Sequence, residues 1–337
     1  MSDLRNLLSA PGRGLRLVLL GSCLLALAGC TRVSLLVANT WARFGDYSVA
    51  SDIPYGPDPL NQLDIYTPAG TPGDLPRPTV VFFYGGCWGG CDTVTRESYR
   101  FVAEALTSEN FVAVMADYRR HPQVKFRQIM ADTGAAVSWV AQHIGAYGGD
   151  SSRIYLMGHS AGAHLAAMLT LNESYLREDI YRSISGFIGL AGPYDFLPFT
   201  EDYQRTLFGP EENYPASQPI NFVDGTEPPM LLLHGQADTV VKQKNLINLA
   251  AKAQSLQGRV ETRLYPEVGH AGILAALSRP LRSRYQVLAD ISGFIRSGPA
   301  VAVTTSQKGP RDDLGSYRAK IRRQQTGKAR PQTGVPE

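Results

Sequence analysis

Short apolar runs recur between about residue 60 and residue 297, and each run is apolar on several successive positions. This pattern is typical of strands buried on both faces of a parallel sheet, whereas a strand with one wet face alternates. The runs are rich in Val, Ile, Leu and aromatic residues, which favour strands. We therefore expect strands at residues 63–66, 79–84, 111–115, 154–157, 186–190, 230–233 and 260–265.

Between these runs lie stretches with helical periodicity. We expect helices at residues 97–107, 127–143, 161–171, 242–256 and 281–295. Strands that alternate with helices predict an α/β fold, in which helices flank a mostly parallel central sheet.

The stretch from about residue 172 to residue 228 breaks the alternation, apart from the one strand it contains. It is rich in tyrosine, phenylalanine and proline. We interpret it as a lid-like insertion over the carboxyl edge of the sheet, where open α/β folds bind ligands. It would form a lid or one wall of an acyl or alcohol pocket. Ordinary surface packing is the alternative.

The two ends lack this organisation. Residues 31–59 have weak periodicity and are expected to lead into a catalytic domain at residues 60–297. Residues 298–337 contain few large apolar side chains and cannot bury enough surface to fold alone. We expect a disordered, solvated basic tail, with contact to an anionic membrane surface as the alternative.

The N-terminus has the features of a secretory signal, placed at residues 1–29. Three arginines supply positive charge, and the apolar stretch 15–27 is short for a spanning helix. The stretch ends in LAGC, which resembles the bacterial lipobox, where the cysteine is lipidated. The resemblance implies a lipid anchor on Cys30 in the bacterial cell envelope. Thr31 favours the outer membrane, facing the periplasm. A secretory peptide without lipidation is the alternative.

Composition and charge narrow the classes of function. The chain has 337 residues, of which 44% are hydrophobic and 19% charged, which suits a globular domain with a sizeable core. The net charge of +3 is small, and much of the basic excess lies at the two ends. The sequence therefore gives no sign of nucleic-acid binding, which requires a clustered basic face.

The chain has four cysteines. Cys23 is removed with the signal, and Cys30 is expected to carry lipid. Cys87 and Cys91 remain, in one glycine-rich loop and in a compartment where disulfides persist. A bond between them is a possible disulfide, and two free thiols are the alternative.

The strongest chemical motif is Gly158-His159-Ser160-Ala161-Gly162, a G-x-S-x-G sequence. It follows the expected strand 154–157 and opens the expected helix 161–171, which is the setting of a nucleophile elbow. The flanking glycines allow the chain to turn sharply and expose the serine hydroxyl. We therefore predict that Ser160 is a catalytic nucleophile.

A serine hydroxyl needs a base to take its proton. In this fold the order is serine, acid, histidine, and of six histidines only His234 and His270 lie beyond the helix that follows Ser160. His270 follows the expected strand 260–265, so it would lie at the carboxyl edge beside Ser160. We predict His270 as the base, and His234 as a structural residue buried at a strand end.

The acid that orients this base is expected in the loop after the preceding strand. Asp238 lies there, whereas Asp195 and Asp224 do not follow that strand. A carboxylate in this place holds the imidazole in its working tautomer and stabilises the imidazolium. We predict Asp238 as the acid and Asp195 as a turn former.

The expected strand 79–84 ends in a glycine-rich loop, GGCWGG at residues 85–90. A loop in this place supplies one N–H group of an oxyanion hole, and the residue after the nucleophile supplies the other. We assign these donors to Gly86 or Cys87 and to Ala161. A plain flexible turn is the alternative.

Several segments resemble the carboxylesterase group of the α/β hydrolases. They are YGGCW at 84–88, DYR at 117–119, GGD at 148–150, GHSAGAH at 158–164, HGQAD at 234–238 and GHAG at 269–272. Similar groups are the hormone-sensitive-lipase-like, feruloyl-esterase-like and kynurenine-formamidase-like hydrolases and the isoprenylcysteine methylesterases. The resemblance spans about residues 60–296 and is specific to the group, not to a substrate.

One departure from the group concerns the oxyanion loop. Many members have His-Gly-Gly, in which the histidine braces the loop, whereas this chain has Tyr84. Either the Tyr84 hydroxyl or a Cys87–Cys91 bond would replace that brace. Enzymes that act on esters of tertiary alcohols usually have a third glycine, and Cys87 stands in its place. We therefore do not expect that activity.

The resemblance implies hydrolysis of a small-molecule ester through an acyl-enzyme, without a metal or an organic cofactor. We expect small or aryl esters, with Trp88 and His159 in contact with the substrate. An arylformamidase or amidase, or a peptidase, is the alternative within the same fold. A non-catalytic surface binding protein on a hydrolase scaffold is the alternative from another class. The sequence leaves the oligomeric state open.

Overall fold

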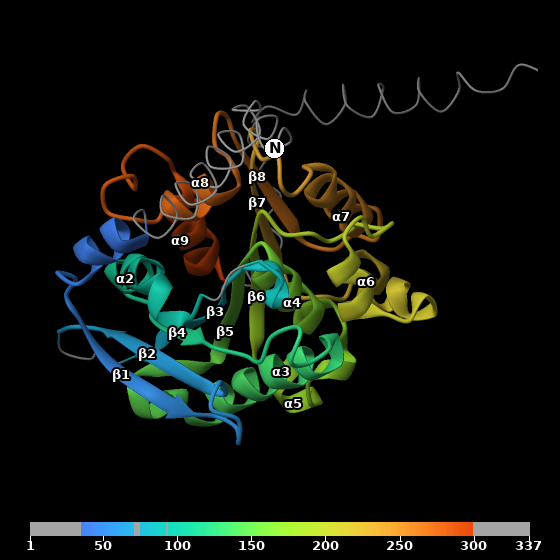
Figure 1. The fold of residues 1–337 in the computed structure, drawn as a ribbon. Helices are drawn as coiled ribbons and strands as arrows, with labels where there is room; N and C mark the ends of the chain where they lie inside the picture. The colour runs from blue at the N-terminus through green and yellow to red at the C-terminus, as the bar shows by residue number, and fades with distance from the viewer. Residues whose placement is uncertain (1–34, 71–74, 92–93, 299–337) are drawn as a thin grey trace, which may run out of the picture. The chain divides into compact units, whose positions relative to one another are not determined.

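The structure, a computed structural model, describes residues 35–70, 75–91 and 94–298. Within these residues eight strands form one sheet: β1 (Tyr47–Pro54), β2 (Gln62–Pro68), β3 (Arg77–Phe83), β4 (Val112–Ala116), β5 (Gly149–His159), β6 (Ile184–Leu190), β7 (Met230–Gly235) and β8 (Val260–Tyr265). Their order is β1-β2-β4-β3-β5-β6-β7-β8 (Figure 1). Only β2 pairs antiparallel with its neighbours, β1 and β4, and all other pairs are parallel. The predicted mostly parallel sheet is confirmed.

The strands at the centre of the sheet are buried on both faces. All five residues of β4 and all six of β7 are buried, because helices cover the sheet on either side. This explains why their apolar residues follow one another without alternation. Each of the strands expected from the sequence is present. β5 begins at Gly149, earlier than expected. Its first five residues are mostly polar and partly exposed, so they lack the apolar run from which the strand was predicted.

The lead-in expected at residues 31–59 contains regular structure. Residues 35–42 are helical, and β1 pairs with β2 along the edge of the sheet. The side chains of β1 are exposed or half-buried, so that the strand carries no run of large apolar residues. The strand was therefore not predicted from the sequence, although its backbone pairs with β2.

Helices cover both faces of the sheet (Figure 1). The long ones are α2 (Arg100–Ser108), α3 (Phe126–His143), α4 (Ala161–Leu171), α7 (Lys244–Ser255) and α9 (Val287–Ser297). α2 contacts α9 on one face, and α3 contacts α4 on the other.

The helix expected at 281–295 begins only at Val287. The preceding residues form turns, because the Arg282 guanidinium donates to the Leu277 carbonyl at 2.9 Å and to Glu104 of α2 at 2.5 Å. In the sequence, a polar side chain that anchors a turn cannot be distinguished from a polar side chain in the first turn of a helix. The expected start of this helix was therefore wrong.

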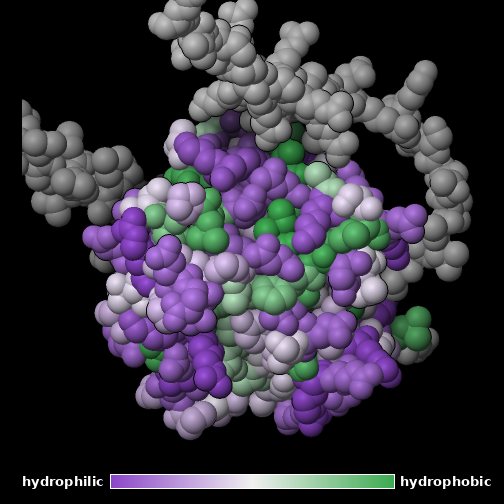
Figure 2. Space-filling model, turned by 90° about the vertical axis from the view of Figure 1, so that its right-hand side faces the viewer, coloured by the Kyte–Doolittle hydropathy of each residue, from purple (hydrophilic) through white to green (hydrophobic). Residues whose placement is uncertain are grey.

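The insertion is a packed body. Besides β6 it contains α5 (Glu178–Tyr181), α6 (Asp202–Phe208) and 3₁₀ turns at Glu211–Ser217 and Pro219–Phe222. Its aromatic rings pack on one another: Phe199 lies 4.5 Å from Tyr214 and 5.0 Å from Phe208, measured between ring centroids. The outer face on the side of α6 and α7 is mostly hydrophilic, with patches of hydrophobic residues (Figure 2).

Three of the sequence expectations concern residues outside the described ranges: the signal at 1–29, the lipidated Cys30 and the tail, of which only Gly298 is described. Among the residues that the structure does describe, no helix has both the length and the apolar character needed to cross a bilayer.

Candidate active site

Ser160 lies in a sharp turn between β5 and α4. Its φ is 55° and its ψ is −124°, a backbone conformation that costs a non-glycine residue about 1–3 kcal/mol. Two glycines make the turn possible. A Cβ on Gly162 would lie 2.0 Å from the Phe83 carbonyl oxygen, and one on Gly158 would lie 2.3 Å from the backbone of Gly162. The predicted strand–turn–helix setting of the serine is present.

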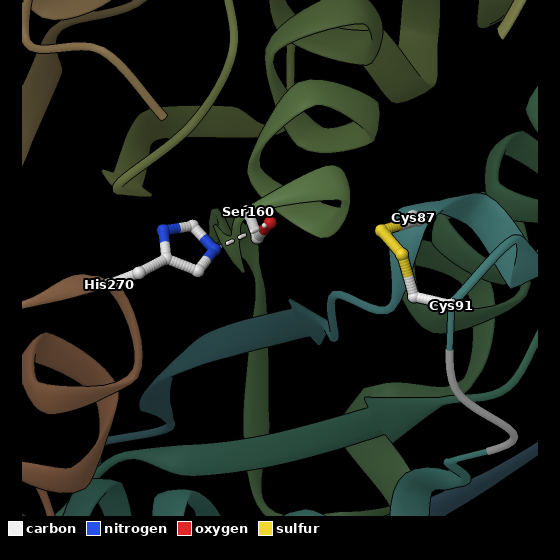
Figure 3. The surroundings of a disulfide bond; sticks show 4 residues. All are labelled: Cys87, Cys91, Ser160 and His270. Carbon is white, nitrogen blue, oxygen red and sulfur yellow. Dashed lines mark hydrogen bonds between the residues drawn. A yellow bond between two sulfur atoms is a disulfide. The ribbon is translucent and has the colours of Figure 1, made fainter. Parts of the chain in front are cut away.

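The three residues predicted to form a triad lie together at the carboxyl edge of the sheet. His270, the first residue of α8 (His270–Ala275), places its Nε2 2.9 Å from the Ser160 Oγ (Figure 3). Its Nδ1 lies 2.8 Å from the Asp238 Oδ2. Asp238 follows β7, and His270 follows β8, so adjacent strand ends supply the acid and the base.

Asp238 is held as a carboxylate. Its side chain is fully buried, and its Oδ1 accepts hydrogen bonds from the N–H groups of Val240 and Val241 at 2.8 and 2.9 Å. Burial pushes its pKa up, but the hydrogen bond and charge of His270 and these backbone donors outweigh burial and leave the pKa below its usual value. An ionised Asp238 accepts a hydrogen bond from the Nδ1–H group of His270, so that the unprotonated Nε2 faces Ser160 and can take its proton.

The competing residues lie elsewhere. Asp195 accepts a hydrogen bond from Asn248 at 2.5 Å, and Asp224 accepts from the N–H and hydroxyl of Thr226. His234 is buried at the end of β7, with its Nε2 3.7 Å from the Asp238 Oδ2. Neither ring nitrogen has a hydrogen-bond partner within the described part of the chain, and burial lowers its pKa. His234 is thus neutral and does not reach Ser160.

The glycine-rich loop after β3 lies beside the nucleophile. Gly86, Cys87 and Trp88 all have positive φ, at 109°, 54° and 55°, which turns the loop tightly. Cys87, Ser160 and Ala161 line the same hollow. Ala161 is the first residue of α4, and the first N–H groups of a helix have no acceptor within it. This placement suits Cys87 and Ala161 as oxyanion donors. Gly86, the other donor predicted in this loop, lines the second hollow at Ser160, and the catalytic role of all three residues stays a prediction.

The loop is braced by both features named from the sequence. The Tyr84 hydroxyl donates to the Asp117 Oδ1 at 2.7 Å. The Tyr118 hydroxyl donates to the Tyr84 carbonyl at 2.8 Å. Burial, and then the Asp117 charge, raise the pKa of Tyr84 well above its usual value, so the phenol keeps its proton. A disulfide joins Cys87 to Cys91 on the other side of the loop (Figure 3).

A buried ion cluster supports Tyr84 from behind. Arg96 contacts Asp64 at 2.8 Å, Asp117 at 2.5 Å and also Asp52. Arg96, Asp64 and Asp117 are all buried. Removing one partner of such a cluster would leave an uncompensated buried charge, at a cost of about 3–5 kcal/mol. Sequence reasoning missed this cluster because its members come from separate strands and loops.

A second unpredicted connection runs through His164 in α4. The Trp88 indole N–H donates to the His164 Nδ1 at 3.2 Å, and the His164 Nε2 donates to the Ser217 carbonyl at 2.7 Å. Burial lowers the pKa of His164 to about 4, so the ring is neutral and can both accept and donate. This chain of bonds joins the oxyanion loop to the insertion through the nucleophile helix.

His159 supports the base. Its Nε2 donates to the His270 carbonyl at 2.9 Å, and the two rings lie 4.8 Å apart. Burial, followed by the neighbouring His270, lowers the pKa of His159 to about 3. The sequence predicted contact with the substrate for His159 and Trp88. Each lines a hollow at Ser160, but the ring N–H of each donates a hydrogen bond to another residue of the protein.

Two hollows of about 510 Å³ each meet at Ser160. The insertion pocket is lined by Trp88, Ala161, Phe196 and Tyr203 among others. The insertion thus forms a wall of the site, one of its two expected roles. The N-terminal pocket is lined by residues of the helical segment 35–42, by Phe101, and by α8. In the described ranges no group of three or more His, Cys, Asp or Glu side chains is placed to hold a metal ion.

The chain is similar to known esterases. The BD-FAE family model matches residues 63–253, more than half of the chain. A probable isoprenylcysteine alpha-carbonyl methylesterase, ICMEL1, of Arabidopsis thaliana is 29% identical over 260 residues, covering 69% of this chain and 53% of that protein. Esterase LipC of Mycobacterium tuberculosis is 30% identical over 240 residues, covering 64% and 58%. The chain thus spans little more than half the length of these relatives.

A solved structure supports the same grouping. The apo form of Thermogutta terrifontis esterase 2 superposes with a TM-score of 0.62 at 25% identity, covering 75% of this chain and 94% of that one.

Replacing Asp238 by Asn should lower kcat for p-nitrophenyl butyrate by roughly 10³–10⁴-fold, because the amide favours the wrong imidazole tautomer. The matched change Asp195→Asn should have little effect, since Asp195 contacts Asn248 and not His270. Steady-state kinetics on both variants measure this, and a larger loss in Asp195→Asn would reverse the assignment of the acid.

Breaking the disulfide by Cys91→Ser should lower kcat more than it raises KM, because the loop would hold the Cys87 N–H less firmly in the transition state. The loss should not exceed the roughly 10²–10³-fold cost of removing one oxyanion donor outright. Dithiothreitol should lower wild-type activity similarly and leave Cys91→Ser unchanged. An unaffected kcat in the variant would show that the bond does not position the loop.

Proposed function

The chain belongs to the BD-FAE family of α/β-hydrolase esterases, and on this basis we propose that it is a serine carboxylic ester hydrolase that works through an acyl-enzyme intermediate. One observation carries the proposal: the continuous hydrogen-bonded series Ser160–His270–Asp238 at a strained turn. A serine whose hydroxyl is hydrogen-bonded to a carboxylate-oriented imidazole is equipped to attack a carbonyl carbon.

In the first half of the reaction Ser160 Oγ bonds to the ester carbonyl carbon while His270 Nε2 takes its proton. Negative charge develops on the carbonyl oxygen, where the N–H groups of Cys87 and Ala161 would receive it. His270 then gives the proton to the alcohol oxygen, the carbon–oxygen bond breaks, and the alcohol leaves.

In the second half water takes the place of the alcohol. His270 removes a proton from water, the hydroxide attacks the acyl carbon, and the same N–H groups hold the charge. Collapse of this intermediate returns the proton to Ser160 and releases the acid. His270 must stay aligned in both halves. The His159 bond to its carbonyl and the Asp238 bond to its Nδ1 support that alignment.

The substrate class that the site favours is a small or aryl ester. The hollows at Ser160 have the size of sites for small organic molecules. Aromatic rings of Trp88, Phe196 and Tyr203 lie in one of them and offer flat surfaces to an acyl or aryl group.

The wild-type protein should hydrolyse p-nitrophenyl acetate, butyrate and decanoate, and Ser160→Ala should lose at least about 10⁴-fold in kcat, because no other group replaces the nucleophile. Formanilide, assayed in parallel, distinguishes an ester hydrolase from an arylformamidase. Turnover that persisted in Ser160→Ala would refute the proposal. A much higher kcat/KM for formanilide would favour the amide alternative.

We further propose that the protein is a lipoprotein anchored through Cys30 in the bacterial outer membrane, facing the periplasm. The sequence LAGC and the preceding apolar stretch carry this proposal. The first described segment after Cys30 supports this proposal. Leu36, Val37, Trp41 and Phe44 are 50–73% exposed, an unusual concentration of large apolar side chains. Such residues, with tryptophan among them, suit a membrane interface.

Cells that express the protein and are fed a labelled fatty acid should incorporate label into the wild type and not into Cys30→Ser. The wild type should also sediment with membranes after a carbonate wash, while Cys30→Ser is released, because the acyl chains on Cys30 supply the anchor. Labelling that persisted in Cys30→Ser would refute the lipobox interpretation.

A further inference from the structure

The two pockets divide the site at the nucleophile. Both are lined by Cys87, Ser160 and Val240, and by no other residue in common. An ester bound to Ser160 therefore has two directions in which its two halves can extend. The family assignment does not say which half goes where.

The position of His270 decides the direction. His270 lines the N-terminal pocket and does not line the insertion pocket, whereas Ala161 and Trp88 line only the insertion pocket. His270 Nε2, which lies 2.9 Å from Ser160 Oγ, must also reach the leaving oxygen. That oxygen is part of the alcohol half, so the alcohol half extends toward His270.

We infer that the N-terminal pocket is the alcohol subsite, that it selects alcohols with a large apolar group, and that the insertion pocket holds the acyl group. This inference rests on the proposed function. In the step concerned, the Oγ–carbon bond forms and the bond from carbon to the alcohol oxygen breaks. The proton that leaves Ser160 passes through His270 to that oxygen, and the neutral alcohol is released into the N-terminal pocket.

The lining of the N-terminal pocket accounts for the apolar preference. Its walls include Leu35, Ala38, Val94, Phe101, Leu274 and Ala275. The described residues that line it include no Asp, Glu, Lys or Arg. The titratable rings that line it are those of Tyr99, His159 and His270, and His159 is buried. The transfer of an alcohol with several methylenes or a ring from water into such a pocket is favourable in free energy, whereas the transfer of a charged alcohol is not.

The insertion pocket differs in character. Glu201, Lys242 and Lys244 line it together with aromatic residues, and all three charged residues are exposed. An acyl group in this pocket meets polar surroundings at its far end. A long apolar chain therefore gains less on this side than in the N-terminal pocket.

Several of the apolar residues that line the alcohol subsite lie outside the residues that the family model matches. Leu35 and Ala38 come from the N-terminal segment, and Leu274 and Ala275 come from α8, whereas the family model matches residues 63–253.

The test varies one half of the ester at a time. The full-length protein is assayed with ethyl, hexyl and cyclohexyl acetate, and with methyl propionate, hexanoate and octanoate. Ala275→Phe fills the N-terminal pocket from a half-buried helix position. It should lower kcat/KM for hexyl and cyclohexyl acetate by about tenfold or more relative to ethyl acetate, because each methylene group that no longer fits in the pocket lowers kcat/KM several-fold. The methyl ester series should change uniformly, without dependence on acyl length.

Ala251→Phe is the matched control, because Ala251 is also a half-buried helical alanine but lines neither pocket. It should leave both series unchanged. If Ala275→Phe does not fold, Ala38→Phe narrows the same pocket from the opposite wall and carries the same expectation. A variant that selectively lost the long-acyl methyl esters would overturn the assignment. So would one that lost no discrimination among the acetates. Failure of the wild type to turn over any ester would instead refute the proposed function.

Discussion

The close crossing of helix α4 over strand β3 is the constraint on which the site depends. Gly162 packs so tightly against the Phe83 carbonyl that no side chain fits between them. This crossing sets Ser160 at its positive φ, and the strand that it crosses continues directly into the oxyanion loop. Backbone packing thus places Ser160 beside the loop that is predicted to supply an oxyanion donor.

The loop after β3 needs more than one brace. Positive φ at Cys87 and Trp88 costs about 1–3 kcal/mol for each residue. One hydrogen bond contributes only about 0.5–1.5 kcal/mol net. The structure supplies several supports: the Tyr84–Asp117 bond, the Cys87–Cys91 disulfide and the Trp88–His164–Ser217 chain. Together they oppose the conformational cost and hold the loop in place before charge develops, as catalysis of acyl transfer requires.

Sequence alone predicted those parts of the fold that leave a local pattern. Buried parallel strands leave apolar runs, and the positions of Ser160, Asp238 and His270 follow from chain order and strand ends. β1 was missed because an exposed edge strand leaves no such run. The bridge through His164 was missed because Trp88 and Ser217 are far apart in sequence and only the packed insertion brings them together. The division of the site into two pockets likewise depends on segments that no motif connects.

We propose that Ser160 is a nucleophile made reactive by His270. The most direct measurement is the rate at which diethyl p-nitrophenyl phosphate modifies the protein, followed by intact mass and by mapping of the labelled peptide. We expect one diethylphosphoryl group per chain, on Ser160, and a rate that falls by orders of magnitude in His270→Ala. Labelling at another residue, or equally fast labelling of Ser160 in His270→Ala, would contradict it.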